Sequence, residues 1–280
     1  MKKATGADNV YCFDHNIRRS TFVEQKNTTA KVQKPISQVH TDYTPTSAPR
    51  RLLDLTQPPK TNDSYSAFRS SEDKDKPLIC SEVVDNCSRF CMINVWRNVS
   101  EEGPIQQYPL AVCAADTLKY PEDFVVFEIH YEDRIGENWF VRENRSIANY
   151  GGNENSSEQS NDGHHKWYYY PQMKKNEALI FKQWDSQGRI QKKVAKTVLD
   201  KLKQEDGKGK QHPEKMISLV EKTTNLKDYS SFNSGAGEKD FGFSDFCIHT
   251  AFEDPGTDRT GNVKVPDRES IEVRCFALFK

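Results

Sequence analysis

The stretch "RFCMINVWRNV", residues 89–99, carries the clearest strand signal in the chain. Its β-branched and aromatic residues favour extended structure. Stretches of similar composition lie on both sides of it, at 9–24, 36–44, 108–118, 124–134, 137–143, 165–173, 177–186, 246–255 and 268–280. Many short strands separated by Pro- and Gly-rich turns predict an antiparallel β sandwich or barrel. A hairpin turn is expected at Ile135-Gly136.

Two segments depart from this strand pattern. From Ile190 onward the apolar residues recur at helical spacing, and residues 213–226 predict a second helix that opens at Pro213. Residues 188–245 are therefore expected to be a mostly polar, partly helical insertion, and whether it is ordered stays open. Residues 150–163 predict a mobile polar loop, and residues 45–78 a loop with one helical turn at Leu52–Leu55. All of this fits within a single domain, 1–280.

Composition sets limits on partners. The chain has 280 residues, and its 40 Lys and Arg nearly balance its 41 Asp and Glu, so no overall field favours nucleic acid or a membrane surface. The Lys-rich stretch 190–210 also contains Glu and Asp, so it is interpreted as a solvated helix face. A nucleic-acid binder would have to show salt-sensitive binding by 188–226. The start lacks a signal-peptide pattern, and seven Cys without a Cys-x-x-Cys pair suggest reduced thiols. A soluble cytoplasmic protein is expected; the oligomeric state stays open.

A candidate metal site begins with His40 and Asp42 in "QVHTDYTPTS". In an extended chain, residues two apart project to the same face. Alone, this pair favours a surface turn. With His249 in "CIHTAFEDP" it becomes two imidazoles and one carboxylate, the facial triad of non-haem Fe(II) oxygenases, which leaves coordination positions open.

The last strand suggests an anion site beside that metal. Period-two alternation places Arg268, Ser270, Glu272 and Arg274 on one face. Inward-facing arginines need anionic partners, and a guanidinium pairs with a carboxylate through two hydrogen bonds. Arg268 and Ser270 are therefore predicted to hold the distal carboxylate of 2-oxoglutarate.

Other assignments remain open. A rival metal set is His165, Asp185 and His249, although it lacks the His-x-Asp spacing. Arg97 of "NVWR" is predicted either to touch the co-substrate or substrate or to form a structural salt bridge, while Trp96 is expected to pack in the core.

Several of these stretches together resemble one family. "FDHNIRRS", "VHTDYTPTSAPRR", "INVWRNV", "PLAVCAADTL", "HKWYYYPQM", "EALIFKQWDS", "HTAFEDP" and "RESIEVR" occur in an order similar to the AsaB-like hydroxylase/desaturase family of fungal secondary metabolism. That family also includes a gibberellin desaturase and the CmcJ-type proteins. The resemblance runs from about Val10 to Phe279 and is interrupted at 150–163 and 188–245.

The resemblance implies a mainly β fold, a double-stranded β-helix of the jelly-roll or cupin-like type with peripheral helices. It implies an Fe(II)- and 2-oxoglutarate-dependent hydroxylase or desaturase that acts on a small secondary metabolite. The family pattern falls on His40, Asp42, His249 and Arg268. The chain departs from the family in its late beginning and its long insertion, so a catalytically inactive accessory or binding protein is the alternative.

Overall fold

The fold is described by a computed structural model over residues 1–21, 32–61, 63–132, 134–142, 165–204, 213–224, 245–254, 257 and 265–280. The predicted loop 150–163 lies outside these ranges, as do 205–212 and 225–244 of the predicted insertion. Within them the chain is built mainly from strands in two sheets, so the predicted mainly β jelly-roll architecture is confirmed. Within the same residues, no helix is long and apolar enough to span a membrane.

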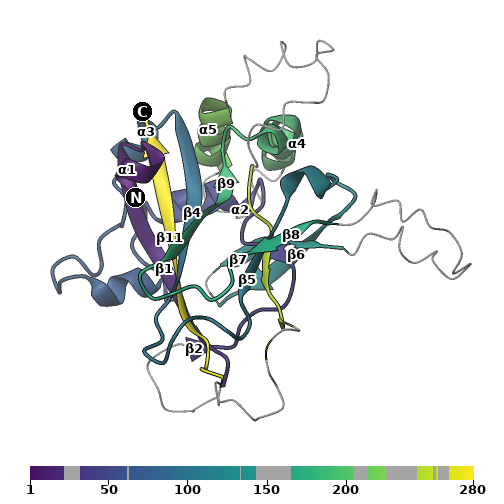
Figure 1. Cartoon of the computed structure of the whole chain (residues 1–280). Coiled ribbons are helices and arrows are strands. Elements are labelled where there is room, and N and C mark those ends of the chain that lie inside the picture. The colour runs from purple at the N-terminus through teal and green to yellow at the C-terminus, as the bar shows by residue number, and fades with distance from the viewer. Residues whose placement is uncertain are drawn as a thin grey trace, which may run out of the picture.

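The first sheet has five strands in the order β2-β1-β11-β4-β9. Their bounds are β1 Asn9–Arg19, β2 Val32–Gln33, β4 Arg89–Asn98, β9 Ala178–Asp185 and β11 Glu269–Phe279. Neighbours are antiparallel except for β1 and β2. The predicted strand 89–99 is confirmed as β4, and the C-terminal strand β11 runs between β1 and β4 in the middle of the sheet (Figure 1).

The second sheet has six strands in the order β6-β7-β3-β10-β5-β8, all antiparallel. Their bounds are β3 His40–Thr41, β5 Leu110–Cys113, β6 Phe124–His130, β7 Ile135–Val141, β8 Trp167–Tyr169 and β10 His249–Ala251. The predicted turn at Ile135-Gly136 is wrong. Both residues pair within the hairpin, opposite His130 and Ile129, and the chain reverses before them.

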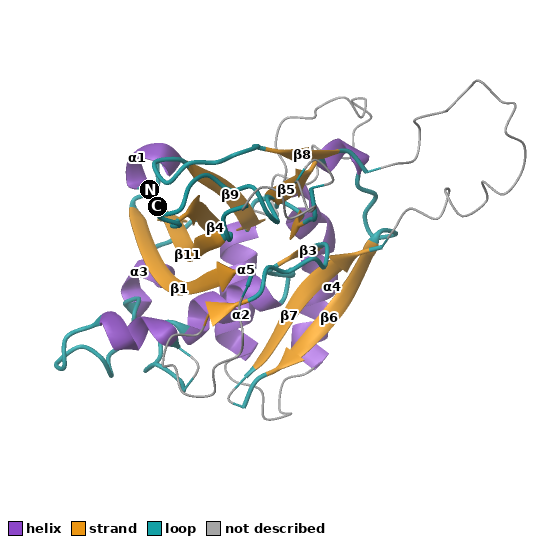
Figure 2. Ribbon diagram, turned by 60° about the horizontal axis from the view of Figure 1, so that its bottom comes forward, coloured by secondary structure: helices purple, strands orange, loops and turns teal. Residues whose placement is uncertain are grey.

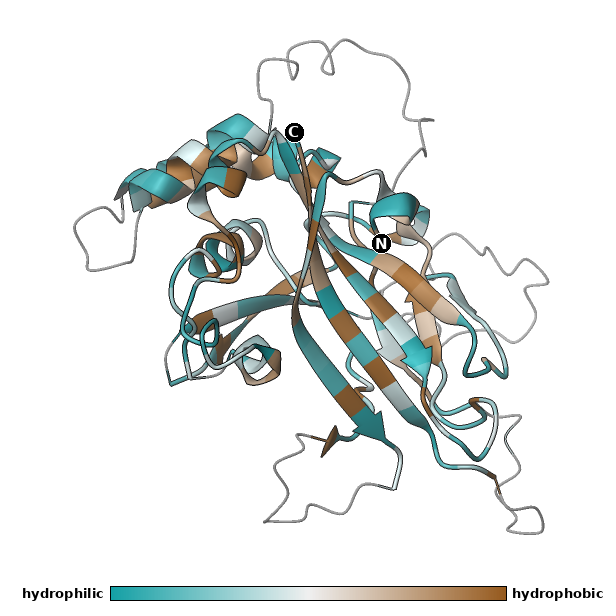
Figure 3. Ribbon diagram, turned by 90° about the vertical axis from the view of Figure 1, so that its left-hand side faces the viewer, coloured by the Kyte–Doolittle hydropathy of each residue, from teal (hydrophilic) through white to brown (hydrophobic). Residues whose placement is uncertain are grey.

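The two sheets form separate layers (Figure 2) and bury a shared core between their inner faces. Hydrophobic and hydrophilic residues alternate along the strands (Figure 3), because successive side chains point to opposite faces. Phe13 and Phe276 of the five-stranded sheet meet Trp139 of the six-stranded sheet in this core. Each such side chain contributes about 2–3 kcal/mol by its burial, so the aromatic residues fix how the layers face each other.

Helices and 3₁₀ turns accompany the two sheets. Their bounds are α1 Lys2–Thr5, α2 Ser47–Asp54, α3 Ser81–Asp85, α4 Arg189–Gln204 and α5 Pro213–Thr224, with 3₁₀ turns η1 Ser64–Phe68 and η2 Ala115–Thr117. The two helices predicted in the insertion are confirmed, and they lie side by side (Figure 1). Val198 and Leu202 of α4 pack on Met216 of α5. Leu219 of α5 joins the main core, so this segment is tied to the sheets.

Candidate metal centre

Three buried side chains meet where β3 and β10 pair. His40 lies directly opposite His249 in the antiparallel register, and their ring centroids are 4.5 Å apart. Asp42 follows β3, and its Oδ1 is 3.6 Å from Nε2 of His40. One possible ligand atom from each residue lies within 4.8 Å of the others. Three atoms so spaced all fall within about 2.8 Å of a common point, close to metal–ligand distances of roughly 2.0–2.2 Å.

Backbone carbonyls orient both imidazole rings. Nδ1 of His40 is 2.8 Å from the carbonyl oxygen of Gln38, and Nδ1 of His249 is 3.3 Å from that of Cys247. When Nδ1–H donates to a carbonyl, the lone pair of the neutral ring is on Nε2. This is the arrangement that metal-binding histidines use, because the second hydrogen bond fixes both tautomer and ring direction.

The carboxylate of Asp42 is held from the five-stranded sheet. Its Oδ2 accepts hydrogen bonds from Nδ2 of Asn94 at 2.9 Å and from Nε of Arg274 at 3.0 Å. Burial opposes ionisation, but Arg274 and the two imidazoles outweigh it, so the pKa of Asp42 lies well below its ordinary value. Asp42 therefore carries a negative charge, with Oδ1 directed to the histidine side.

The two imidazoles differ in their protonation. Burial and the nearby His40 lower the pKa of His249 to about 3, so this ring is neutral near neutral pH. Burial also opposes protonation of His40, but the adjacent carboxylate of Asp42 outweighs it, and the pKa of His40 is raised. A neutral imidazole beside a carboxylate is a donor set suited to a divalent cation.

Gln183 of β9 connects the strands that carry these residues. Its Oε1 accepts hydrogen bonds from the backbone N–H of Asp42 at 2.9 Å and from Oγ1 of Thr41 at 3.0 Å. Its Nε2 donates to the carbonyl oxygen of Cys247 at 3.4 Å. Because Gln183 is fully buried, it fixes β3 relative to the segment that leads into β10.

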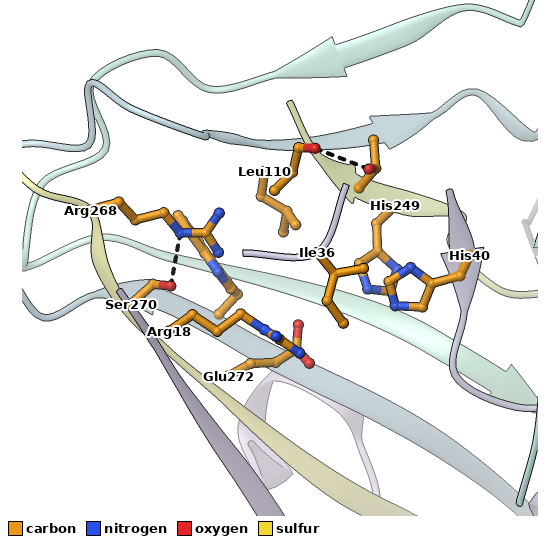
Figure 4. Close-up of a pocket in the computed structure, with 11 residues that line it drawn as sticks. Arg18, Ile36, His40, Leu110, His249, Arg268, Ser270 and Glu272 are labelled. Carbon is orange, nitrogen blue, oxygen red and sulfur yellow. Dashed lines mark hydrogen bonds between the residues drawn. The ribbon is translucent and has the colours of Figure 1, made fainter. Parts of the chain in front are cut away.

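A small cavity of about 20 Å³ extends from the histidines toward β11. Arg268 and Ser270 lie at one end and the two histidines at the other (Figure 4). Nε of Arg268 donates to Oγ of Ser270 at 3.0 Å. The apolar part of the cavity wall is formed by Ile36, Leu110, Trp96 and Ala251. The cavity therefore joins a possible cation site to a basic end.

The predicted site residues fall into two groups. His40, Asp42, His249, Arg268 and Ser270 line or adjoin this cavity. Arg97 does not: alternation along β4 turns Trp96 inward, and Arg97 is exposed and donates to the backbone carbonyl of Lys175. Its predicted contact with the co-substrate is corrected accordingly. Trp96 is buried as expected, but it also lines the cavity.

The rival set is not gathered in the described structure. Asp185 pairs with Arg89 at 2.6 Å and with Lys182 at 2.8 Å. The ring of His165 lies against the backbone carbonyl of Thr117, with Nδ1 3.0 Å from its oxygen. Both side chains are thus engaged away from His249.

Sequence reasoning missed three contributors: Arg18, Asn94 and Gln183. Alternation places Asn94 on the same face as Trp96, which was a usable signal once that face was known to point inward. Arg18 and Arg19 are adjacent in β1, so one of two consecutive arginines had to face the interior. Nothing local distinguishes Gln183, because its partners are 141 and 64 residues away in the chain.

Comparison with known proteins places these features among oxidoreductases. Residues 1–213 match the model of the YDMC family, described as an oxidoreductase/YMDC permease-like domain. An "Alpha-ketoglutarate-dependent dioxygenase tstK" of Talaromyces stipitatus is 27% identical over 66% of this chain and 52% of that protein. A "Hydroxylase/desaturase CTB9" of Cercospora beticola is 30% identical over 66% of this chain and 50% of that protein. The expected resemblance to fungal hydroxylase/desaturase proteins is confirmed.

A solved structure supports the fold. The "iron and alpha-ketoglutarate-dependent endoperoxidase NvfI" aligns with 99% of this chain and 65% of that chain, at a TM-score of 0.50 and 20% sequence identity. At this identity the likeness concerns the fold. The chain spans about half the length of the curated relatives it matches.

Proposed function

We infer the function of this chain from the premise that it belongs to the YDMC family, the oxidoreductase/YMDC permease-like domain family. Within that family we propose an Fe(II)- and 2-oxoglutarate-dependent oxygenase that hydroxylates or desaturates a small secondary metabolite. One observation carries the proposal: the cluster of His40, Asp42 and His249 opens into a buried cavity with a basic end. The relatives' names describe the same chemistry for those proteins.

The donor set fits ferrous iron. Two imidazole nitrogens and one carboxylate oxygen form the set of the 2-His-1-carboxylate sites that leave positions open for exogenous ligands. Both rings have Nδ1 at a carbonyl, and Asp42 is ionised. Bound iron would supply activation of O₂ and removal of hydrogen from the substrate. His40, Asp42 and His249 would hold the ion, and Asn94, Arg274 and Gln183 would keep those residues in place.

The basic end fits a dicarboxylate co-substrate. Arg268 is 2% exposed, and among the described residues no carboxylate forms an ion pair with it. A buried guanidinium without an anion is costly. The Nε1–H of Trp96 is also buried without a hydrogen-bond partner in the described residues, and Trp96 lines the same cavity. A carboxylate of 2-oxoglutarate would satisfy both Arg268 and this orphan donor.

The rest of the cavity indicates what the protein acts on. Ile36, Leu110 and Ala251 give the cavity apolar walls, which would contact the carbon skeleton of an organic substrate and exclude water. We propose a small-molecule substrate and no nucleic-acid or membrane partner. A cytoplasmic location belongs to the same proposal, and the seven free cysteines agree with it.

The test begins with binding. Purified protein is titrated anaerobically with Fe(II), or with Mn(II) as an air-stable probe, and then with 2-oxoglutarate. We expect one metal ion per chain and binding of 2-oxoglutarate that depends on the metal, followed by slow formation of succinate when Fe(II) and O₂ are supplied. Absence of metal-dependent binding of 2-oxoglutarate would contradict the proposal. Tight binding without any turnover would instead favour an accessory protein that kept the site and lost the reaction.

A further inference from the structure

A second arginine, Arg18 of β1, projects into the same cavity. It lies directly opposite Ser270 in the register of β1 and β11. Its side chain is buried, and one end of the guanidinium, NH1, donates to the backbone carbonyl of Lys34 at 2.8 Å. Among the described residues no carboxylate forms an ion pair with Arg18. A buried cation whose remaining donors face a cavity indicates an anionic ligand.

The position of Arg18 differs from that of Arg268. Figure 4 shows Arg18 reaching toward the carboxyl group of Glu272, between the Arg268–Ser270 end of the cavity and the two histidines. Burial, and next the charge of Arg18, lower the pKa of Arg268 to about 9. The two guanidinium groups are thus close enough to repel each other, and an anion between them would relieve that repulsion.

The charges of the site support a dianion. Three arginines face three carboxyl groups here: Arg18, Arg268 and Arg274 against Asp14, Asp42 and Glu272. Burial raises the pKa of Glu272 and so favours its neutral form, which leaves the arginines at least balancing the charge of the carboxylates. A divalent metal ion would add two positive charges to this largely buried site, and a dicarboxylate would offset them.

We propose that Arg18 is a further co-substrate-binding residue, which contacts the carboxylate next to the keto group while Arg268 and Ser270 hold the distal carboxylate. This inference rests on the proposed function. It assigns the two carboxylates of one 2-oxo acid to two arginines on neighbouring strands. Arg18 therefore recognises 2-oxo acids of any chain length, and Arg268 selects those that carry a second carboxylate.

The experiment compares two ligands on the Mn(II)-loaded protein by calorimetry. 2-Oxoglutarate has both carboxylates, and 2-oxovalerate has the same five-carbon chain without the distal one. Loss of a hydrogen bond to a charged group corresponds to about tenfold to hundredfold in affinity. We expect Arg18→Ala to weaken both ligands by a similar factor in this range, and Arg268→Ala to weaken 2-oxoglutarate while leaving 2-oxovalerate unchanged.

Arg97→Ala is the matched control, because Arg97 is an exposed arginine on the neighbouring part of the same sheet. It should bind both ligands as the unsubstituted protein does. Arg18→Lys keeps the charge and should lose less affinity than Arg18→Ala. Circular dichroism and Mn(II) affinity show whether Arg18→Ala folds. If it does not, Arg18→Lys is tested with the same two ligands, and it should weaken both by a similar but smaller factor.

The outcomes separate the two proposals. Suppose that the unsubstituted protein binds Mn(II) and 2-oxoglutarate, and that the Arg18 variants bind each ligand as tightly as the unsubstituted protein does. The role of Arg18 is then refuted and the oxygenase proposal stands. Weakening of 2-oxoglutarate alone by Arg18→Ala would also refute it, because Arg18 would then share the distal subsite. If the unsubstituted protein binds no 2-oxoglutarate, the proposed function itself fails.

Discussion

The two sheets contribute to the site in different ways. The six-stranded sheet supplies both imidazoles from two of its shortest strands, β3 with two residues and β10 with three. The five-stranded sheet supplies charged side chains from β1 and β11, which have eleven residues each, and the amide of Asn94 from β4, which has ten. Asp42 follows β3 of the six-stranded sheet in the chain, but its carboxylate accepts hydrogen bonds from Asn94 and Arg274 of the five-stranded sheet.

The short strands β3 and β10 cannot by themselves hold the cluster of His40, Asp42 and His249 in place. A two-residue strand offers few ladder hydrogen bonds, so the direction of His40 and Asp42 depends on contacts from the opposite layer. Gln183 and Arg274 provide those contacts. Metal binding should therefore depend on both sheets, whereas recognition of the co-substrate should depend mainly on the five-stranded sheet. Substitutions in each sheet test this division.

The largest effect is expected from Arg274→Met. The substitution leaves Asp42 buried with its main counter-charge removed, and breaking a buried pair in this way costs about 3–5 kcal/mol. Urea unfolding at neutral pH measures the loss. The control is Arg89→Met, whose pair with Asp185 lies at a half-exposed arginine in the same sheet and should matter less. Equal losses in the two variants would contradict the central place of Arg274.

The same variant has a pH signature. Arg274 holds the pKa of Asp42 well below the ordinary value of 3.8. For a carboxyl group with a depressed folded-state pKa, the stabilisation is present above the unfolded value and is lost as the pH falls toward the folded one. We therefore expect the difference in stability between the unsubstituted protein and Arg274→Met to be largest near neutral pH and to shrink on acidification, because Asp42, whose pKa burial raises once Arg274 is removed, becomes protonated first in the variant. A difference that grows on acidification would be inconsistent with this account.

The next largest effect should come from the six-stranded sheet. His249→Ala removes one of three proposed ligands, and we expect Mn(II) affinity to fall by about a hundredfold or more, exceeding the typical loss for a residue that only orients a ligand. His130→Ala is a matched control, because His130 is an exposed histidine of β6 paired with Glu128. Retention of metal affinity in His249→Ala would exclude this residue as a ligand.

An intermediate effect is expected at the contact between the layers. Gln183→Met keeps the approximate size of the side chain but removes the hydrogen bonds to Asp42, Thr41 and Cys247. We expect Mn(II) affinity to fall by about tenfold, as for other residues that orient metal ligands. Gln187→Met, two positions beyond β9, should leave the affinity unchanged. If both variants bind Mn(II) normally, the short strands hold the cluster without support from β9.

The smallest effect concerns the outer face of the five-stranded sheet, away from the cavity. The exposed Cys12 lies opposite Cys275 in the β1–β11 register, with the sulfur atoms 3.2 Å apart. The hydrogen bond from Cys275 lowers the pKa of Cys12 to about 6. The rate of alkylation of Cys12 by iodoacetamide should rise with pH and level off above about pH 7, because the thiolate is the nucleophile.

Mass spectrometry of the peptide that contains Cys12 measures this rate. Cys275→Ala removes the donor, so the half-maximal pH should move upward toward that of an ordinary thiol. Metal affinity should stay the same, since neither sulfur lines the cavity. A half-maximal pH that is unaffected by Cys275→Ala would mean that the pairing does not control the thiol.

The sequence predicted those features that depend on local patterns. Strand β4, the helical spacing of α4, and the shared face of Arg268, Ser270, Glu272 and Arg274 all follow from periodicities within one element, and the structure agrees. Alternation also separated Trp96 from Arg97, but it could not say which face was inward. That is why Arg97 was assigned to the co-substrate and is instead exposed.

Contacts between the sheets were beyond sequence reasoning. The hydrogen bond from Arg274 to Asp42 joins residues 232 positions apart, and no local pattern connects them. The pairing of His40 with His249 required the topology that places β10 beside β3; the sequence indicated it only through the facial-triad pattern and the family resemblance. The role of Gln183 follows from the packing of β9 against both, which depends on the whole core.

The central strand β11 sets the distance between the two ends of the site. Its inward side chains, from Ser270 to Arg274, follow the regular spacing of an extended chain. The number of residues between them therefore determines how far the anion-binding end lies from the carboxylate of Asp42. A one-residue deletion within this strand would exchange its faces and bring Ile271 and Val273 into the cavity. A two-residue deletion would keep the faces but shift the anchors by about 7 Å. The length of this segment is therefore as much a determinant of ligand size as any side chain on it.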